Sequence, residues 1–509
     1  MGYINGHQIW GAIALDVDSQ ARRTIARVYR EELRRDPTIY ELKDVLWRSG
    51  AYVAYEAEGY RPLRPLDTEQ DLRDELRVPV RVIEPEPGPG RDAGERPLQP
   101  PADTPESDRP LEPVVDPPRE TLPVALDPIT VSGRIFTVGR EPFDWREVSA
   151  FTLQKLLIDG RVAEATDFVR TMKQHGVNVF RVIGELHHPA WEHQRGRDWR
   201  FGPWDAAWGP ALDQLCRLLS AEGVYLRYTL FDSRATSRFD TLAKKIAFAA
   251  RVTDVLAPYP GVVVEVANEP GRGHTLFSTG DPDLATIARR LPSPRALGAE
   301  WGAYGHEDTY DRPPAEYVTF HAERRREFDG WNWPKRLGDY GVVNTGARPV
   351  VSAEPINAGD SGAANDKEPN SAIWAAYGAL SRIVPSHGYA PCFHYDGGLF
   401  CERPNAQTTT CLEAFMSGCD AVPLRARMLP WTNGQQSQSP WRGYSQTDPP
   451  SPERPFRIYG RGTGAAYIGV AIRHRPGWSW PDLRYPLRRV AEWHATGGGA
   501  FSASVWVGQ

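Results

Sequence analysis

The segment Gly261-Val-Val-Val-Glu-Val-Ala-Asn-Glu-Pro270 decides the fold expected for this chain. Its apolar, β-branched run suits a strand that is buried on both faces, as the strands of parallel sheets are. The run ends in Asn268-Glu269-Pro270, which puts a carboxylate at the C-terminal edge of the strand. Active sites of α/β barrels lie at that edge, so Glu269 is the first candidate for a catalytic residue.

A second strand of the same kind occurs at Ala347-Arg-Pro-Val-Val-Ser-Ala-Glu354-Pro355. Glycoside hydrolysis needs two such carboxyl groups, one to protonate the leaving oxygen and one to attack the sugar or activate water. The pair resembles the catalytic pair of glycoside hydrolase clan A, the cellulase-like retaining enzymes with a TIM barrel. The resemblance implies that Glu269 is the acid/base, that Glu354 is the nucleophile and that a polysaccharide or oligosaccharide is the substrate.

Six further segments match the remaining strands of such a barrel, in order. They are 144–151, which follows a small hairpin at 133–139, then 176–182, 222–232, 296–304, 317–321 and 388–396. Helical patterns such as 161–174 and 211–220 alternate with these strands, which predicts a parallel sheet with crossover helices. The resemblance covers about residues 130 to 420 and implies an α/β fold, a (β/α)8 TIM barrel.

Six residues are candidates for binding the substrate: Asn268, Arg181, His321, His188, Tyr395 and Trp301. In clan A an Arg of the second strand steadies the nucleophile, the Asn before the acid/base binds the sugar 2-hydroxyl, and the sixth strand often carries a His. Arg181, Asn268 and His321 match those positions. The eighth strand usually supplies a Trp, whereas this chain offers Phe393, His394 and Tyr395 there, so the detail of the first sugar subsite stays open.

Tryptophans gather in the expected loops of the catalytic face. They follow strands two, five and six: Trp191, Trp199, Trp204, Trp208, Trp301, Trp331 and Trp333. Flat aromatic faces pack against sugar rings, but aromatic side chains also fill cores. We expect some of these tryptophans to line a substrate cleft and most other aromatic residues to pack in the core.

The chain is long enough for more than one domain, because a barrel takes about 250 residues. Residues 84–128 hold thirteen prolines and form a predicted linker. Before it, residues 1–83 form a small helical or mixed unit, with helices expected at 18–35 and 38–47, and the thin core of this unit suggests docking to another protein. The barrel is expected at 129–425 and a C-terminal β-rich module at 426–509, with strands at 456–459, 465–472 and 500–507.

The formal net charge of −5, with both signs interspersed, argues against a nucleic-acid partner. No apolar run reaches the ~20 residues of a membrane span. The N-terminus lacks the features of a signal peptide, so a cytoplasmic, a virion-associated and a mature secreted location all stay open.

Neither the five cysteines nor the histidines have metal-ligand spacing, so no cofactor is predicted. Zinc bound by His187, His188, His321 and His394 is the weaker interpretation. A disulfide between Cys392 and Cys401 across the strand-eight loop is also open.

One function from another class competes with the glycosidase. The N-terminal unit and the linker would suit a carbohydrate-binding or attachment protein, for example a phage tail or virion component that uses the barrel as a glycan platform. The presence of both Glu269 and Glu354 favours catalysis, because a pure binder needs neither acid. The sugar, the linkage, endo or exo action and hydrolysis or transglycosylation are not readable from the sequence.

Overall fold

The computed structural model describes residues 27–28, 30–31, 126–187, 191–232, 237–270, 276–278, 280–301, 312–321, 348–354, 357–358, 367–383, 389–429, 456–462, 464–473, 486–495 and 501–508. The chain forms two compact units, Met1–Val114 and Val115–Gln509. The four described residues of the first unit are helical and lie in the helix predicted at 18–35. The helix predicted at 38–47 and the linker up to residue 125 lie outside the described residues, and the domain boundaries stay predictions.

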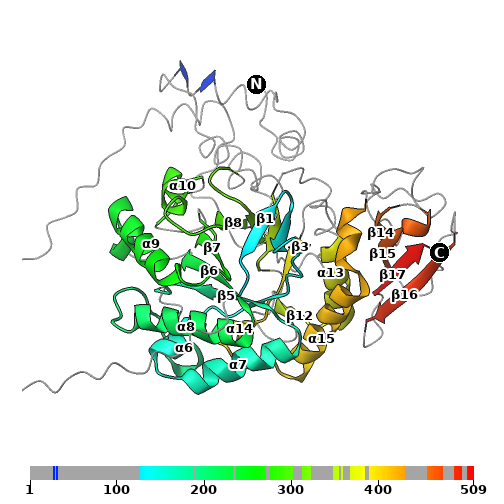
Figure 1. The fold of residues 1–509 in the computed structure, drawn as a ribbon, viewed down its shortest axis with the longest axis horizontal. Coiled ribbons are helices and arrows are strands. Elements are labelled where there is room, and N and C mark those ends of the chain that lie inside the picture. The colour runs from blue at the N-terminus through cyan, green and yellow to red at the C-terminus, as the bar shows by residue number, and fades with distance from the viewer. Residues whose placement is uncertain are drawn as a thin grey trace, which may run out of the picture. The chain divides into compact units, whose positions relative to one another are not determined.

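Eight parallel strands close into a barrel (Figure 1). In chain order they are β4 (Glu147–Ser149), β5 (Val179–Ile183), β6 (Tyr225–Phe231), β7 (Val262–Ala267), β8 (Arg295–Trp301), β9 (Val318–His321), β10 (Val350–Ser352) and β13 (Tyr389–Phe393). Each strand pairs with the next, and β13 pairs with β4 to close the ring. The predicted (β/α)8 barrel is confirmed, and each strand overlaps the segment expected for it.

Helices alternate with the strands on the outside of the barrel. They are α6 (Leu153–Ile158), α7 (Val162–Gln174), α8 (Trp208–Glu222), α9 (Leu242–Leu256), α10 (Pro282–Ala288), α13 (Ser371–Ile383), α14 (Asp396–Leu399) and α15 (Ala406–Ala421), with short 3-10 turns η2 (Gln194–Gly196), η3 (Ser237–Phe239) and η4 (Leu424–Met428). In α8, Leu212, Leu215 and Leu219 recur at helical spacing and are buried against the barrel. The helix ends at Gly223, whose φ of 69° is left-handed and therefore favours glycine.

A small antiparallel sheet precedes the barrel and covers the apolar lower layer of its interior. Its strands are β1 (Ile129–Ser132), β2 (Ile135–Val138) and β3 (Glu141–Pro142). Phe136 packs on Trp145 and Tyr317 with ring centroids 4.6 and 5.5 Å apart, and Phe143 packs edge-on to Tyr225. The N-terminal end of the barrel interior is therefore filled by apolar side chains.

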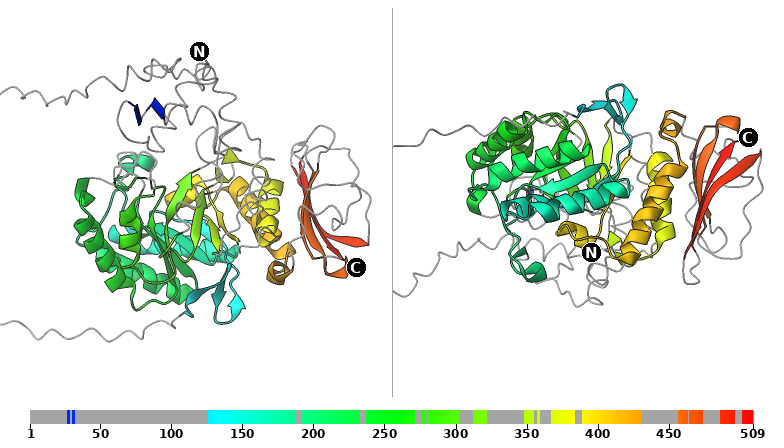
Figure 2. Two further views of the ribbon diagram at one scale, coloured as in Figure 1. Left: turned by 90° about the horizontal axis from the view of Figure 1, so that it is seen from above. Right: turned by 60° about the horizontal axis from the view of Figure 1, so that its bottom comes forward.

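A four-stranded antiparallel sheet forms the C-terminal module and packs on α13 (Figure 2). Its strands are β14 (Phe456–Arg461), β15 (Ile468–Arg473), β16 (Leu487–His494) and β17 (Ser502–Gly508), in the order β14-β15-β17-β16, with the 3-10 turn η5 (Gly464–Ala466) between the first two. Residues 372–383 of α13 are all buried, between the barrel and this sheet. The predicted module is confirmed, although its strand β16 was not predicted.

Helices α13 and α15 approach each other closely through two glycines. A Cβ at Gly378 would lie 2.2 Å from the carbonyl oxygen of Phe415, and one at Gly418 would lie 2.0 Å from that of Ala375. Neither position has room for a side chain, because the atoms it would meet belong to the facing backbone.

Two further short strands, β11 (Asn357–Ala358) and β12 (Lys367–Glu368), lie between β10 and α13 in the chain and pair with each other.

All five cysteines are free thiols, so the Cys392–Cys401 disulfide does not form. Cys392 lies 3.5 Å from the hydroxyl of Ser149, and Cys401 lies 3.8 Å from that of Thr152. Among the described residues, no helix is both long and apolar enough to cross a membrane.

Candidate active site

The Asn-Glu-Pro turn lies at the C-terminal end of β7. The N–H of Asn268 donates to the carbonyl of Phe231, 2.9 Å away, which carries the strand pairing one residue past β7. Glu269 then adopts a φ of 39°, a left-handed conformation that non-glycine residues rarely take. Beside it, a Cβ on Gly298 would lie 2.6 Å from the carbonyl oxygen of Ala267 and 2.8 Å from the ring of Pro270. The glycine in β8 therefore makes room for the turn that carries Glu269.

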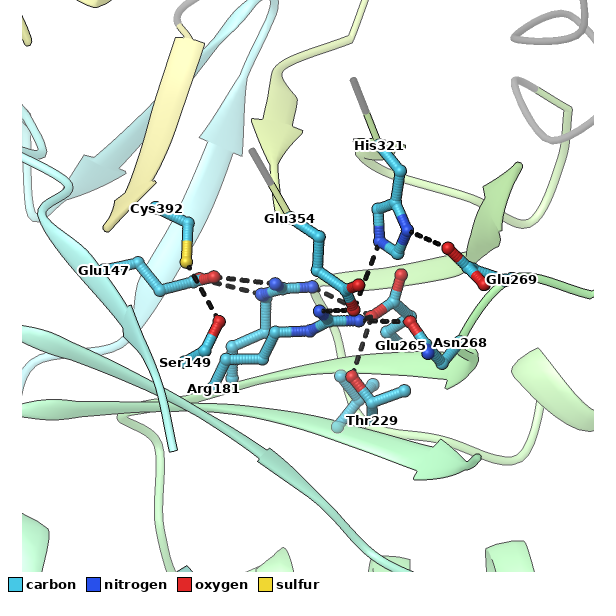
Figure 3. Close-up of polar contacts among 12 residues, drawn as sticks. Glu147, Ser149, Arg181, Thr229, Glu265, Asn268, Glu269, His321, Glu354 and Cys392 are labelled. Carbon is cyan, nitrogen blue, oxygen red and sulfur yellow. Dashed lines mark hydrogen bonds and ion pairs between the residues drawn. The ribbon is translucent and has the colours of Figure 1, made fainter. Parts of the chain in front are cut away.

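Three strand ends bring Glu269, His321 and Glu354 together (Figure 3). His321 is the last residue of β9, and Glu354 follows β10 by two residues. The Nδ1 atom of His321 lies 2.9 Å from Oε1 of Glu269, and its Nε2 atom lies 3.8 Å from Oε1 of Glu354. One oxygen of each carboxylate and a ring nitrogen of His321 all lie within 4.8 Å of one another. The imidazole thus stands between the two acids.

Arg181 of β5 holds both Glu354 and Asn268. Its two terminal nitrogens donate to Oε1 of Glu354 at 2.5 Å and to Oδ1 of Asn268 at 2.6 Å. The side chain is fully buried, and its guanidinium lies 4.9 Å from the ring centroid of Phe151. A planar fork with fixed donors suits this double contact in a way that a lysine does not. The contact with Glu354 expected from the sequence is present.

Below the site, charged side chains fill a layer of the barrel interior, which we call the ionic layer: Glu147, Arg181, Arg227 and Glu265. Arg227 donates two hydrogen bonds to Glu147, at 2.8 and 2.7 Å, and a third to Glu265 at 2.8 Å. Arg181 lies 3.4 Å from the same Glu265 oxygen, so the layer continues up to Glu354. All four members are fully buried, and sequence reasoning found only Arg181.

The ionic layer favours the charged form of Glu265. Burial on its own would raise the pKa of Glu265, but the guanidinium groups of Arg227 and Arg181 hold that pKa below its usual value. Thr229 adds a hydrogen bond of 2.7 Å to the same carboxylate. Glu265 therefore balances Arg181 from below while Glu354 balances it from above. The guanidinium under the candidate nucleophile is fixed on both sides.

A second pair of acids follows the neighbouring strands β5 and β6. Glu185 is fully buried and accepts a hydrogen bond of 3.0 Å from the N–H of Asp232. Burial and the nearby Asp232 carboxylate raise the pKa of Glu185 well above its ordinary value. The neutral, protonated form of Glu185 is thus favoured, in contrast to Glu265 in the ionic layer, whose pKa is lowered.

The remaining predicted substrate-binding residues are not joined to this cluster by the described contacts. Tyr395 is buried, and its hydroxyl donates to the carbonyl of Glu402, 2.6 Å away. His188 lies outside the described residues, and so does the side chain of Trp301. The assignment of these three residues to substrate binding stays a prediction.

The tryptophans after β5 are mostly packing residues. Trp208 is fully buried and donates to the carbonyl of Gly184, and Trp199 is buried beside Phe400. Trp191 and Trp204 are partly buried against the same core. Trp331 and Trp333 lie outside the described residues. Whether any of them meets a sugar stays a prediction.

Within the described part of the chain, Glu269, His321 and Glu354 form the only group of three acids, histidines or cysteines close enough to share a metal ion. His187 and His394 are not in it, and Nδ1 of His394 is 2.8 Å from the hydroxyl of Ser149. The histidines considered for zinc therefore do not converge in the described structure. A cation at the group would also compete with Arg181 for Glu354.

No model of a protein family matches the sequence, and no curated protein matches it either. Solved structures do match the fold. One, described as a glycoside hydrolase, is 12% identical, covers 75% of this chain and 97% of its own, and gives a TM-score of 0.52. Another, a glycoside hydrolase family 5 protein from Bacteroides vulgatus, is 13% identical, covers 75% and 94%, and gives 0.50. The likeness in fold to glycoside hydrolases that the sequence suggested is confirmed.

Proposed function

We propose that the protein is a retaining glycoside hydrolase that acts on a polysaccharide or oligosaccharide, with Glu269 as acid/base and Glu354 as nucleophile. The observation that carries the proposal is the short separation of the two carboxylates, which have one oxygen each within 4.8 Å of the other. Retaining glycosidases hold their acids about 5 to 5.5 Å apart, and inverting ones about 6.5 to 9.5 Å apart. This short separation supports retention, because inversion needs space for a water between the second carboxylate and the anomeric carbon.

In the first step Glu354 attacks the anomeric carbon and Glu269 protonates the departing oxygen. The nucleophile must be ionised, and its ion pair with Arg181 favours that form. Because Arg181 is also held by Glu265 and Asn268, its position does not depend on the substrate. The sugar then forms an ester with Glu354 while the leaving group departs with the proton of Glu269.

His321 contacts both acids through one ring. Its Nδ1 atom lies 2.9 Å from Oε1 of Glu269 and its Nε2 atom lies 3.8 Å from Oε1 of Glu354. The imidazole therefore fixes the positions of the two carboxyl groups relative to each other, and the second oxygen of Glu269 is the one that would protonate the departing group. The side-chain oxygen of Asn268 accepts a hydrogen bond from Arg181, so the amide N–H groups of Asn268 are the atoms that can donate to the sugar 2-hydroxyl.

In the second step Glu269, now a carboxylate, takes a proton from water, and the water attacks the glycosyl ester. Glu354 leaves, and the anomeric configuration is restored.

A screen of polysaccharides and aryl glycosides tests the proposal, with NMR detection of the first product anomer. Wild type should cleave at least one substrate with retention, whereas Glu354→Gln should lose activity by several orders of magnitude. Glu413→Gln, on the exposed face of α15, is the matched control.

A chemical rescue identifies the nucleophile. Glu354→Gly leaves an opening of about the lost side chain, while Glu269 remains as acid/base. Azide with an activated aryl glycoside should restore cleavage and yield a glycosyl azide of inverted configuration. Unchanged activity of Glu354→Gln would reject this assignment. Glycan binding without cleavage in every form would favour the carbohydrate-binding or attachment protein instead.

A further inference from the structure

A pocket of about 550 Å³ lies outside the catalytic cluster. It is built from the first turn of α7, the η2 segment that follows β5 and the residues that follow α14. The η2 segment follows the C-terminal end of β5 and the residues after α14 follow that of β13, as Glu269 and Glu354 follow their strands, whereas the first turn of α7 follows α6. The volume falls in the range of about 300 to 1,000 Å³ that is usual for small-molecule sites. Trp199 and Phe400 form a buried aromatic floor with ring centroids 5.5 Å apart.

Four guanidinium groups line this pocket, which we call the arginine pocket: Arg161, Arg195, Arg197 and Arg403. Three of them have carboxylate partners among the lining acids. Arg161 pairs with Glu164, and Arg403 pairs with Asp167. Arg195 lies 3.4 Å from Glu402 and also pairs with Asp396, which lies outside the lining, at 2.6 Å. Within the described residues, Arg197 has no carboxylate within ion-pair distance, so it is the arginine whose charge a ligand would meet.

Aromatic rings contact Arg195 and Arg197, and for Arg197 the ring is not accompanied by a carboxylate partner within the described residues. The guanidinium of Arg197 lies 6.0 Å from the ring centroid of Trp199, and that of Arg195 lies 5.3 Å from that of Phe400. A ring face attracts a cation yet leaves its charge and its N–H donors available. Arg161 supplies a further donor, since its Nη1 is buried and makes no hydrogen bond in the described structure. A buried donor without a partner is unfavourable, and an anion would satisfy it.

Two residues of the arginine pocket also have an unusual backbone conformation. Among the described residues, only Glu269, Arg195 and Cys401 combine a side chain with a positive φ, and the last two line the arginine pocket. Such conformations are unfavourable for residues with a side chain and cluster at binding and catalytic sites. The arginine pocket and the catalytic cluster therefore both contain non-glycine residues with a positive φ.

We infer that the arginine pocket binds the anionic group of an acidic sugar unit, a carboxylate or a sulfate ester, in the glycan that the enzyme acts on. Planar guanidinium groups match both anions through paired N–H donors. The inference rests on the proposed function, because it names the chemical class of the substrate. It predicts a second point of attachment for the glycan on the end of the barrel that carries the two acids.

Binding is measured by titration calorimetry with the full chain carrying Glu354→Gln, so that no turnover interferes. The probes are an oligogalacturonate, its uncharged methyl ester and a sulfated galacto-oligosaccharide. We expect at least one anionic probe to bind, and the methyl ester to bind at least about tenfold more weakly. Binding should weaken with added salt. Arg197→Gln should lower the affinity about tenfold, Arg197→Lys should lower it less, and Arg170→Ala, an exposed arginine of α7, should not change it.

Preference for one anionic probe identifies carboxylate or sulfate as the group bound. Equal binding of the methyl ester, unchanged binding by Arg197→Gln, or no binding of any anionic probe would each overturn the inference. Melting temperatures of the variants separate lost binding from lost folding, and Arg197→Lys keeps the charge if the Gln variant is unstable. These outcomes leave the proposed function untouched, since cleavage by the wild type is measured separately. Conversely, the calorimetric result does not depend on Glu354 as nucleophile.

Discussion

At the scale of single residues, Arg181 joins the ionic layer to the candidate nucleophile. Arg181→Lys keeps the charge but cannot reach Glu354 and Asn268 together, since an ammonium lacks the planar fork. We expect kcat/KM to fall about 100-fold, as when one donor to a reacting group is lost. Steady-state kinetics on the best substrate of the screen measures the effect. Arg217→Lys, in an exposed pair with Asp213, is the control, and equal activity of the two variants would contradict the role of Arg181.

Glu185 gives a prediction about stability and pH. Its pKa is raised in the folded protein by burial and by Asp232, whereas an unfolded Glu titrates near about 4.3. Between those two pKa values the folded state holds a proton that the unfolded state releases, so the free energy of unfolding falls as pH rises. Glu185→Gln carries no such proton. We expect its melting temperature to exceed that of the wild type at about pH 8, and by less at about pH 4.

Circular dichroism melts over that pH range measure the difference. Glu413→Gln, which replaces an exposed acid, should follow the wild type throughout. A Glu185→Gln curve parallel to that of the wild type would show that this carboxyl is ionised in the folded protein.

The sequence identified the residues of the site that end strands, and of the charged residues inside strands it identified only Arg181, through the resemblance to clan A. Glu269 and Glu354 stand out because a carboxylate follows an apolar run at a strand end. Arg227 and Glu265 lie within such runs, where a charge normally indicates a solvent-exposed face. Only closure of the barrel turns those positions inward. The sequence did contain one signal for this pair, namely opposite charges on the adjacent strands β6 and β7. That signal can be recognised only when the pairing register of the two strands is known.

At the scale of elements, the two glycines between α13 and α15 set how closely these helices pack. Gly418→Ala adds a Cβ that would lie 2.0 Å from the carbonyl oxygen of Ala375. Alanine favours a helix by up to about 1 kcal/mol, but overpacking costs about 1 to 3 kcal/mol, so we expect net destabilisation. Denaturant unfolding measures it. Gly209→Ala in α8 is the control, because its nearest neighbour would be Arg251 at an ordinary 3.6 Å. A more stable Gly418→Ala would show that the helices can separate.

Strands were predictable where both faces are buried and less so where one face is exposed. The barrel strands appear in the sequence as apolar runs bounded by turns, and each was found. Strand β16 has the sequence Leu-Arg-Arg-Val-Ala-Glu-Trp-His and a largely exposed or half-buried pattern, so its charges mask the alternation. Its pairing with β17 also shifts register between Arg489 and Ala491. That irregularity follows from tertiary packing, which a single sequence does not display.

At the scale of the whole molecule, α13 depends on the C-terminal module. Its residues 372–383 are buried, and Arg461 of β14 donates to the carbonyl groups of Ile383 and Leu429. A chain that ends at residue 429 would expose the outer face of this helix. We expect that chain to melt at a lower temperature and to bind a hydrophobic dye. A chain that begins at residue 115 removes the other unit and is the control, and equal melting of both chains would contradict the expectation.

The ionic layer also limits how this protein can change over generations. Replacing Arg227 alone would leave Glu147 and Glu265 buried without that partner, at a cost of about 3 to 5 kcal/mol, against a total stability of about 5 to 15 kcal/mol. A concerted exchange of the set for apolar side chains can be neutral or stabilising. Each single replacement in the ionic layer is therefore destabilising, although the fully apolar set can be stable. Epistasis of this kind preserves a charged barrel interior even under selection for stability alone.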